Sequence, residues 1–290
     1  MDNGPSQVFY PSSFQEFFSS WNRFPDAVPY AGGTDLIRSQ GKRATELPRN
    51  ILCLDRMDDL RKITRTERYL EIGAAVRLND IISLGKVVPG VLTKTLEGIA
   101  DPQIRSLATI GGNLCNKSRR LDASVPMAAL EARYELKTAS ESRWISASRF
   151  SARPGLPALG ERELLTRIRI PLEHWNYSMY RKFKSPGVNE SGGVIVLVMK
   201  IQKNILTEIR IVYSRNIILQ DRSSEALLAG KQLPLTRKAA EDFFERWRRY
   251  LEEMGKGAYS QEEHLSKSEI SLLKIQIMNF IEKAILEISD

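Results

Sequence analysis

The sequence has few of the residues that usually hold metal ions. It contains two cysteines, Cys53 and Cys115, and two histidines, His174 and His264, in 290 residues. Neither cysteine lies in a C-x-x-C spacing, and an iron–sulfur cluster needs about four ligands. A zinc site would need carboxylates or both cysteines in addition to the histidines. We therefore expect no metal site in this chain.

Long apolar runs are also missing. No stretch approaches the roughly 18 to 20 consecutive apolar residues that cross a bilayer, and no apolar run follows a basic N-terminus. These absences predict a cytoplasmic protein without a membrane span. With 42% hydrophobic and 27% charged residues, the composition is typical of a globular chain. Its length favours two domains.

The formal net charge is +8, but basic residues are not concentrated as a nucleic-acid groove would require. They form small groups at 61–68, 117–120 and 246–249, and the last group alternates with glutamates and an aspartate. A solvated helix face explains that last pattern better than a DNA-binding surface does. We expect no nucleic-acid partner.

Apolar periodicity predicts a mixture of strands and helices. Residues 164–170 alternate between apolar and polar and end at Pro171, as expected of a strand. A second pair of strands forms a hairpin around Lys203–Asn204. Ser13 precedes a helix that carries four aromatic residues, as an N-cap does. The predicted strands are 8–10, 27–30, 50–54, 69–73, 134–137, 164–170, 194–201 and 206–213, and the other predicted helices are 78–84, 91–100, 125–130, 223–228, 236–254 and 266–288.

Two Gly-Gly pairs stand out as possible ligand-binding loops. Gly32–Gly33 lies between an extended run and a polar helix start, and Gly111–Gly112 lies between Thr109 and Asn113. Glycine allows positive φ and close backbone approach, so each loop resembles a phosphate cradle. Two such backbone nests suit a ligand with two phosphates. Neither loop has the P-loop or the G-x-G-x-x-G spacing, and no nucleophile motif is present, so the chain is predicted to hold a cofactor.

The two loops carry a resemblance to a known family. The segment 31–36 (AGGTDL) and the segment 104–116 (IRSLATIGGNLCN), followed by Asp122, resemble the FAD-binding medium subunit of molybdenum hydroxylases. That family includes xanthine dehydrogenase, carbon monoxide dehydrogenase, nicotinate dehydrogenase and 4-hydroxybenzoyl-CoA reductase. The likeness extends through the strand ending at Pro171 to the segment 224–231 (SEALLAGK).

The resemblance implies an α+β fold with two domains. Residues 1–175 would form an FAD-binding domain of the vanillyl-alcohol oxidase (PCMH-like) type, with subdomains of about 1–57 and 58–175. Residues 176–290 would form a C-terminal α+β domain with a small antiparallel sheet and helices.

The resemblance also implies where the cofactor binds. The segment 29–36 and the loop 109–113 would surround the FAD pyrophosphate, and Asp122 would hold a cofactor hydroxyl. Ile99 and Leu165 would line the pocket, and Lys184 would lie near the isoalloxazine ring. Simpler interpretations are a helix cap for Asp122 and a solvated strand end for Lys184. The implied residues are Pro29, Tyr30, Ala31, Gly32, Gly33, Thr34, Asp35, Leu36, Ile99, Thr109, Ile110, Gly111, Gly112, Asn113, Asp122, Leu165 and Lys184, and no catalytic side chain is implied.

The implied function is electron transfer within a larger oxidoreductase. Partners would be a molybdopterin-binding large subunit and a 2Fe-2S small subunit, and the flavin would pass electrons to NAD or another acceptor. The segment 185–193 and the basic residues Lys117, Arg119 and Arg120 depart from the family pattern. Two alternatives stay open: a flavin-free assembly or regulatory protein with the same fold, and a stand-alone noncovalent flavoenzyme.

Overall fold

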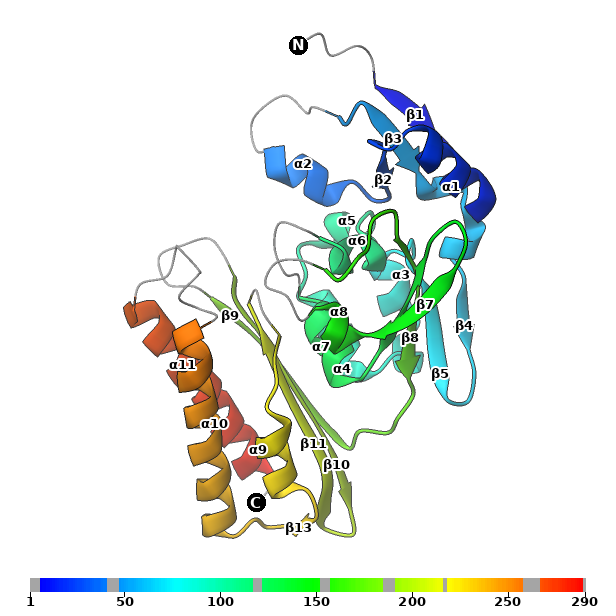
Figure 1. Ribbon diagram of the computed structural model, residues 1–290. Helices are drawn as coiled ribbons and strands as arrows, with labels where there is room; N and C mark the ends of the chain where they lie inside the picture. The colour runs from blue at the N-terminus through cyan, green and yellow to red at the C-terminus, as the bar shows by residue number, and fades with distance from the viewer. Residues whose placement is uncertain are drawn as a thin grey trace. The chain divides into compact units, whose positions relative to one another are not determined.

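The computed structural model describes residues 6–40, 47–116, 122–151, 157–184, 191–215, 218–257 and 267–288, and Figure 1 shows its helices and strands. The chain packs into two compact units. The first contains residues 1–123 and 130–172, and the second contains residues 124–129 and 173–290. The short helix α7 (Ser124–Ala129) therefore belongs to the second unit although its neighbours in sequence belong to the first.

The first unit begins with a three-stranded parallel sheet in which β3 (Asn50–Cys53) lies between β1 (Gln7–Phe9) and β2 (Val28–Tyr30). The helix α1 (Phe14–Arg23) begins at Ser13, whose hydroxyl accepts a hydrogen bond from the Glu16 backbone at 3.2 Å. Its aromatic residues pack into the core. The short helix α2 (Thr34–Gln40) follows β2, and the 3-10 turns η1 (Leu54–Arg56) and η2 (Asp58–Leu60) follow β3.

A five-stranded antiparallel sheet completes the first unit. One face carries apolar residues such as Ile72 and Ile168, which are fully buried, while Glu71 pairs with Arg169 on the other. The strand order is β4 (Ile63–Arg65), β5 (Tyr69–Gly73), β8 (Leu164–Pro171), β6 (Arg133–Lys137) and β7 (Ser142–Ser146). The accompanying helices are α3 (Leu78–Ser83), η3 (Gly85–Val87), α4 (Gly90–Glu97), α5 (Pro102–Arg105), α6 (Ile110–Leu114) and α8 (Ala147–Phe150).

The second unit is built on a sheet that is covered on both faces. Residues 194–199 of its central strand are all at most 1% exposed. The sheet order is β12 (Ile218–Leu219), β11 (Ile205–Ser214), β10 (Ser191–Gln202) and β9 (Tyr177–Lys184), and β13 (Lys231–Gln232) also pairs with β11. Alternate residues pack against the helices α10 (Arg237–Gly257) and α11 (Lys267–Glu287), while α7 and α9 (Arg222–Leu228) also contact β11.

The α+β class is confirmed, and so are most of the predicted elements. The hairpin turns at Lys203 and Asn204, which both adopt positive φ. The strand β8 ends at Pro171, as predicted, whereas the pattern missed the strands β4, β7, β9, β12 and β13. The domain limits 1–175 and 176–290 stay predictions. The family departures at 117–120 and 185–190 lie outside the described residues.

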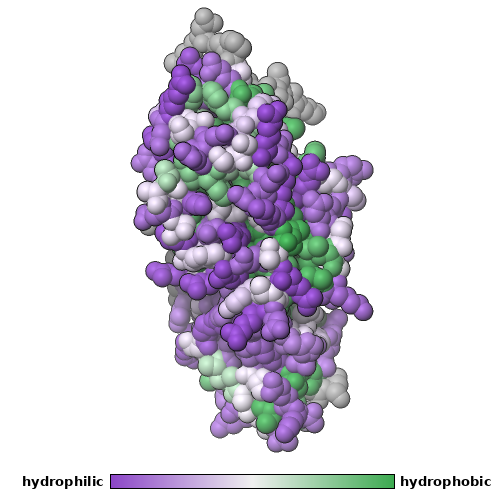
Figure 2. All heavy atoms as spheres, turned by 90° about the vertical axis from the view of Figure 1, so that its right-hand side faces the viewer, coloured by the Kyte–Doolittle hydropathy of each residue, from purple (hydrophilic) through white to green (hydrophobic). Residues whose placement is uncertain are grey.

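Exposed apolar side chains are scattered over the described surface. The face shown in Figure 2 is mostly hydrophilic, with apolar residues in small separate patches. Among the described helices, none is long and apolar enough to cross a membrane. The same part of the chain contains no group of three histidine, cysteine or acidic side chains arranged to bind a metal ion.

Candidate functional site

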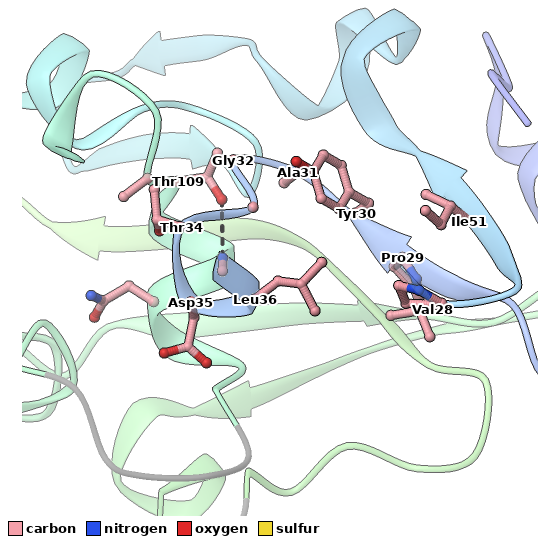
Figure 3. A pocket seen from close by; sticks show the side chains of 15 residues that line it. Val28, Pro29, Tyr30, Ala31, Gly32, Thr34, Asp35, Leu36, Ile51 and Thr109 are labelled. Carbon is pink, nitrogen blue, oxygen red and sulfur yellow. Dashed lines mark hydrogen bonds between the residues drawn. The ribbon is translucent and has the colours of Figure 1, made fainter. Parts of the chain in front are cut away.

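The two glycine loops line one cavity of about 200 Å³ in the first unit. In Figure 3, Thr109 lies beside Gly32 and Thr34, whereas Val28, Pro29 and Ile51 lie toward the other end. The cavity therefore has a polar end made by the loops and an apolar end made by β2 and β3. Its lining residues are Val28, Pro29, Tyr30, Ala31, Gly32, Gly33, Thr34, Asp35, Leu36, Pro48, Ile51, Ala108, Thr109, Gly112 and Asn113.

The first loop needs glycine because other backbone segments approach it closely. A Cβ atom on Gly32 would lie 1.9 Å from the carbonyl oxygen of Leu107, so no side chain fits there. Gly33 has a φ of +67°, which favours glycine, and a Cβ at this position would lie 2.1 Å from the hydroxyl of Tyr30. The contact with Leu107 joins two segments that are far apart in sequence, which explains how both loops reach one cavity.

The start of α2 leaves backbone donors at the polar end. The first hydrogen bond of this helix runs from the Ile37 N–H to the Gly33 carbonyl at 3.2 Å. The N–H groups of Thr34 and Asp35 therefore have no acceptor within the helix. The Asp35 carboxylate pairs with Arg38 one turn later, with Nε and Oδ1 3.2 Å apart. This pairing partly offsets the negative charge of Asp35 beside the cavity.

The second loop differs from the expected backbone nest, because its N–H groups already have acceptors. The Thr109 hydroxyl caps α6 by accepting from the Gly112 N–H at 3.1 Å, and the Thr109 carbonyl accepts from Asn113 at 3.0 Å. The N–H groups of Ile110 and Gly111 bond to carbonyls of the segment after β5, at 3.0 and 2.8 Å. The loop therefore forms the first turn of a short helix, and of its side chains those of Thr109 and Asn113 line the cavity.

Asn113 provides an unpaired polar group at this site. The residue is 8% exposed and lines the cavity. Its side-chain Oδ1 is buried and has no hydrogen-bond partner among the described residues. Because buried polar atoms are nearly always paired, an orphan beside a cavity indicates a ligand or an ordered water. The assignment of oxygen and nitrogen in the amide can be exchanged, so Asn113 can either accept or donate.

Eleven of the predicted residues line the cavity and six do not. Ile110 is fully buried beneath the loop, and Gly111 packs so closely on Ala74 that a Cβ would lie 2.7 Å from its carbonyl oxygen. Leu165 is 3% exposed within β8. Ile99 is half-buried in the turn after α4. Asp122 belongs to the first unit and directly precedes Ala123 and α7. Lys184 belongs to the second unit, where it is the last residue of β9.

Four lining residues were missed by the sequence analysis. Val28 and Ala108 each lie one residue outside a predicted segment, so a wider segment would have included them. Pro48 and Ile51 reach the cavity because β3 pairs with β2 in parallel, with Val28 opposite Ile51. No local pattern in the sequence marks such a neighbour across strands.

Comparison with known proteins identifies the family. Residues 4–173 match the family described as the FAD binding domain in molybdopterin dehydrogenase. The glyceraldehyde dehydrogenase medium chain of Sulfolobus acidocaldarius is 29% identical over 203 residues, which cover 69% of this chain and 72% of that one. The carbon monoxide dehydrogenase medium chain of Afipia carboxidovorans is 30% identical over 214 residues, 72% of this chain and 74% of that one.

Other relatives are matched over a smaller share of their length. The xanthine dehydrogenase FAD-binding subunit of Escherichia coli O157:H7 is 30% identical over 53% of this chain and 56% of its own. In structure, carbon monoxide dehydrogenase from Hydrogenophaga pseudoflava superposes with a TM-score of 0.80 at 22% identity, covering 100% of this chain and 98% of that one. This likeness shows the fold. The match over residues 4–173 shows that the chain belongs to the family of FAD-binding domains of molybdopterin dehydrogenases.

Proposed function

We propose that this chain is the FAD-binding subunit of a molybdenum hydroxylase complex and that it transfers electrons within that complex. Its partners would be a molybdopterin-binding large subunit and a 2Fe-2S small subunit. When bound, the FAD would accept electrons from the iron–sulfur clusters and deliver them to NAD or another acceptor. The observation that carries the proposal is the joining of two glycine loops around one cavity that also contains the unpaired Oδ1 of Asn113.

The residues at the polar end fit a diphosphate. Glycine at position 32 lets the first loop lie against the Leu107 backbone, and the N–H groups of Thr34 and Asp35 lie at the start of α2 beside the cavity. Asn113 supplies an amide that can donate to a phosphate oxygen or accept from a ribose hydroxyl. The first loop would thus bind through its backbone, and the second through a side chain.

The cavity is too small for the whole dinucleotide. Its volume of about 200 Å³ falls below the roughly 300 to 1,000 Å³ of drug-sized ligand sites. We infer that the cavity holds the diphosphate and adjacent groups, and that the rest of FAD extends over residues outside it. Ile99, Asp122, Leu165 and Lys184 are the residues that we propose for these outer contacts. The chain's own contribution would be binding and orientation, with no acid or base catalyst.

The two alternatives can be separated from this proposal. A flavin-free assembly protein would not need the unpaired Asn113 amide beside a glycine cradle, so the cavity favours a cofactor. A stand-alone noncovalent flavoenzyme would bind FAD equally well, but it would turn over a substrate without partner subunits. The cytoplasmic location stays a prediction from the sequence.

A visible absorption spectrum of the purified chain, recorded before and after acid precipitation, tests the proposal. If the chain is colourless, FAD is added and unbound cofactor is removed first. We expect flavin bands that pass into the acid supernatant, because no covalent attachment is proposed. A folded chain that neither contains nor takes up FAD would contradict the proposed function and would favour the assembly protein.

A further inference from the structure

Arg105 connects three segments of the first unit that are separate in sequence. Its Nη1 donates to the carbonyl oxygens of Glu97, Ile99 and Ala100 at 3.0, 2.9 and 2.8 Å. Its Nε donates to the side-chain Oδ1 of Asn79, in α3, at 3.3 Å. Carbonyls at the end of a helix lack intrahelical donors, and a nearby arginine can supply them. One guanidinium therefore organises the turn that follows α4.

That turn has a backbone conformation that needs support. Ala100 has a φ of +46°, in the left-handed region that residues other than glycine rarely adopt. The shortest of the Arg105 hydrogen bonds reaches the carbonyl of this residue. On the other side of the turn, the Asp101 carboxylate caps α5 by accepting from the Ile104 N–H at 2.9 Å. The turn is thus held by side chains on both sides of Ala100.

The same arginine lies next to the wall of the cofactor cavity. Leu107, two residues further along, presents the carbonyl that packs against Gly32, and Ala108 lines the cavity. Asn79, which accepts from Arg105, also donates to the Ser106 hydroxyl at 2.7 Å. Arg105 itself is not among the lining residues. It can therefore affect the cavity only through the segments that it holds.

We propose that Arg105 is a positioning residue of the cofactor site. It fixes the turn 97–100 relative to the segment 107–113, and it thereby places Ile99 and the Leu107 carbonyl for binding of a dinucleotide. This inference rests on the proposed function. A lysine cannot substitute, because a single ammonium lacks the planar fork that reaches several acceptors at once.

The test uses the full chain with Arg105→Lys and Arg105→Ala. Arg65→Lys is the matched control, because Arg65 is exposed in β4 and its side chain makes no hydrogen bond within the described part of the chain. FAD dissociation constants are measured by quenching of flavin fluorescence, with and without methylguanidinium. Amide hydrogen exchange is measured on the FAD-free chains.

We expect Arg105→Lys and Arg105→Ala to raise the FAD dissociation constant at least about tenfold, which corresponds to about 1.4 kcal/mol. Methylguanidinium should restore part of the affinity to Arg105→Ala and none to Arg105→Lys. In the FAD-free variants, exchange should accelerate in 97–100 and 107–113 while the strand 133–137 stays protected. Arg65→Lys should match the wild type in both measurements.

Two outcomes would overturn the inference. One is FAD affinity within about twofold of the wild type in Arg105→Lys, a difference too small for a lost positioning residue. The other is faster exchange throughout the first unit, which would make Arg105 a residue of general stability. If the wild-type chain takes up no FAD, the proposed function fails, and the exchange pattern still decides whether Arg105 positions the two segments.

Discussion

The two units of this chain differ in how their buried groups are arranged. In the second unit, residues 194–199 of β10 and 209–214 of β11 are buried on both faces of the sheet, and the Arg210 side chain reaches the Ala129 carbonyl at 2.9 Å. In the first unit, a cavity is kept open between glycine loops, and Asn113, whose Oδ1 has no partner among the described residues, lines that cavity. The difference indicates that packing in the second unit serves stability, whereas the first unit gives up some stability to keep a ligand site.

Removing a core side chain of the second unit should have the largest effect. Trp247 is fully buried against the sheet. We expect Trp247→Ala to destabilise the second unit by about 3 to 5 kcal/mol, because it leaves a large cavity. Calorimetry with and without FAD checks this. At temperatures where the variant remains folded, its FAD affinity should stay within about threefold of the wild type. A much larger loss of affinity would show that the core of the second unit also supports cofactor binding.

Adding a side chain to the first glycine loop should have the next largest effect. Gly32→Ala places a Cβ against the Leu107 backbone, which cannot move as a flexible side chain could. We expect the FAD dissociation constant to rise on the order of a hundredfold, about 2.7 kcal/mol, in a titration followed by flavin fluorescence. Gly90→Ala is the control, since a Cβ at Gly90 meets nothing within 4 Å. Equal affinities for the two variants would show that the first loop does not bind the cofactor.

Asn113→Leu should separate binding from stability. Leucine has a similar size and removes the unpaired amide, so we expect the FAD-free chain to become more stable by about 1 kcal/mol. The same change should weaken FAD binding about tenfold, because a hydrogen bond to the ligand is lost. Thermal melts without ligand and FAD titrations provide the two measurements. If Asn113→Leu lowered the stability of the FAD-free chain, the amide would have a partner within the protein.

A smaller effect depends on pH and concerns Glu163 of the first unit. Hydrogen bonds from Arg143 at 2.6 and 2.7 Å, outweighing burial, lower the pKa of the Glu163 carboxyl below its usual 4.5. A lowered pKa stabilises the fold above pH 4.5, and this stabilisation is lost as the pH falls through the folded pKa. We expect Glu163→Gln to cost about 1 kcal/mol at pH 7, since Arg143 is half exposed and solvent screens the pair. Urea unfolding at pH 7 and at pH 3 should show the difference shrinking at the lower pH.

Glu225 of the second unit should show the smallest effect, with the opposite sign. Burial is the largest influence on its carboxyl and raises its pKa above 4.5, despite a hydrogen bond from the Ile211 N–H at 2.8 Å. A raised carboxyl pKa means that the fold loses stability as the pH rises above 4.5. Glu225→Gln should remove that loss, so the variant should gain stability relative to the wild type between pH 4 and pH 8. A pH-independent difference in urea midpoints would contradict this.

The sequence predicted those features that local pattern determines. The alternation in β8 and the hairpin at Lys203–Asn204 were clear because each strand carries its own apolar signal. The strands β7 and β9 were missed because polar and charged residues fill much of them. Membership of α7 in the second unit depends on packing between distant segments, which no local pattern encodes.

For the site, the sequence predicted the positions of both glycine loops but not the role of each loop. Gly111 and Gly112 look equivalent in sequence, yet Gly111 packs on Ala74 and Gly112 lines the cavity. The N–H groups of the second loop donate to the Thr109 carbonyl at the start of α6 and to carbonyls of the segment after β5, so they are not available to a ligand. The unpaired amide of Asn113 could not be anticipated either, because pairing is a property of the folded environment.

The measurement that tests the central claim most directly is a competition between ADP and FAD, together with direct binding of riboflavin. We propose that the cavity between the two glycine loops recognises the diphosphate. ADP should therefore displace FAD from the chain, and riboflavin, which lacks phosphate, should bind at least about a hundredfold more weakly than FAD. Riboflavin binding as tight as that of FAD, with no displacement by ADP, would show that the glycine loops are not the cofactor's main binding site.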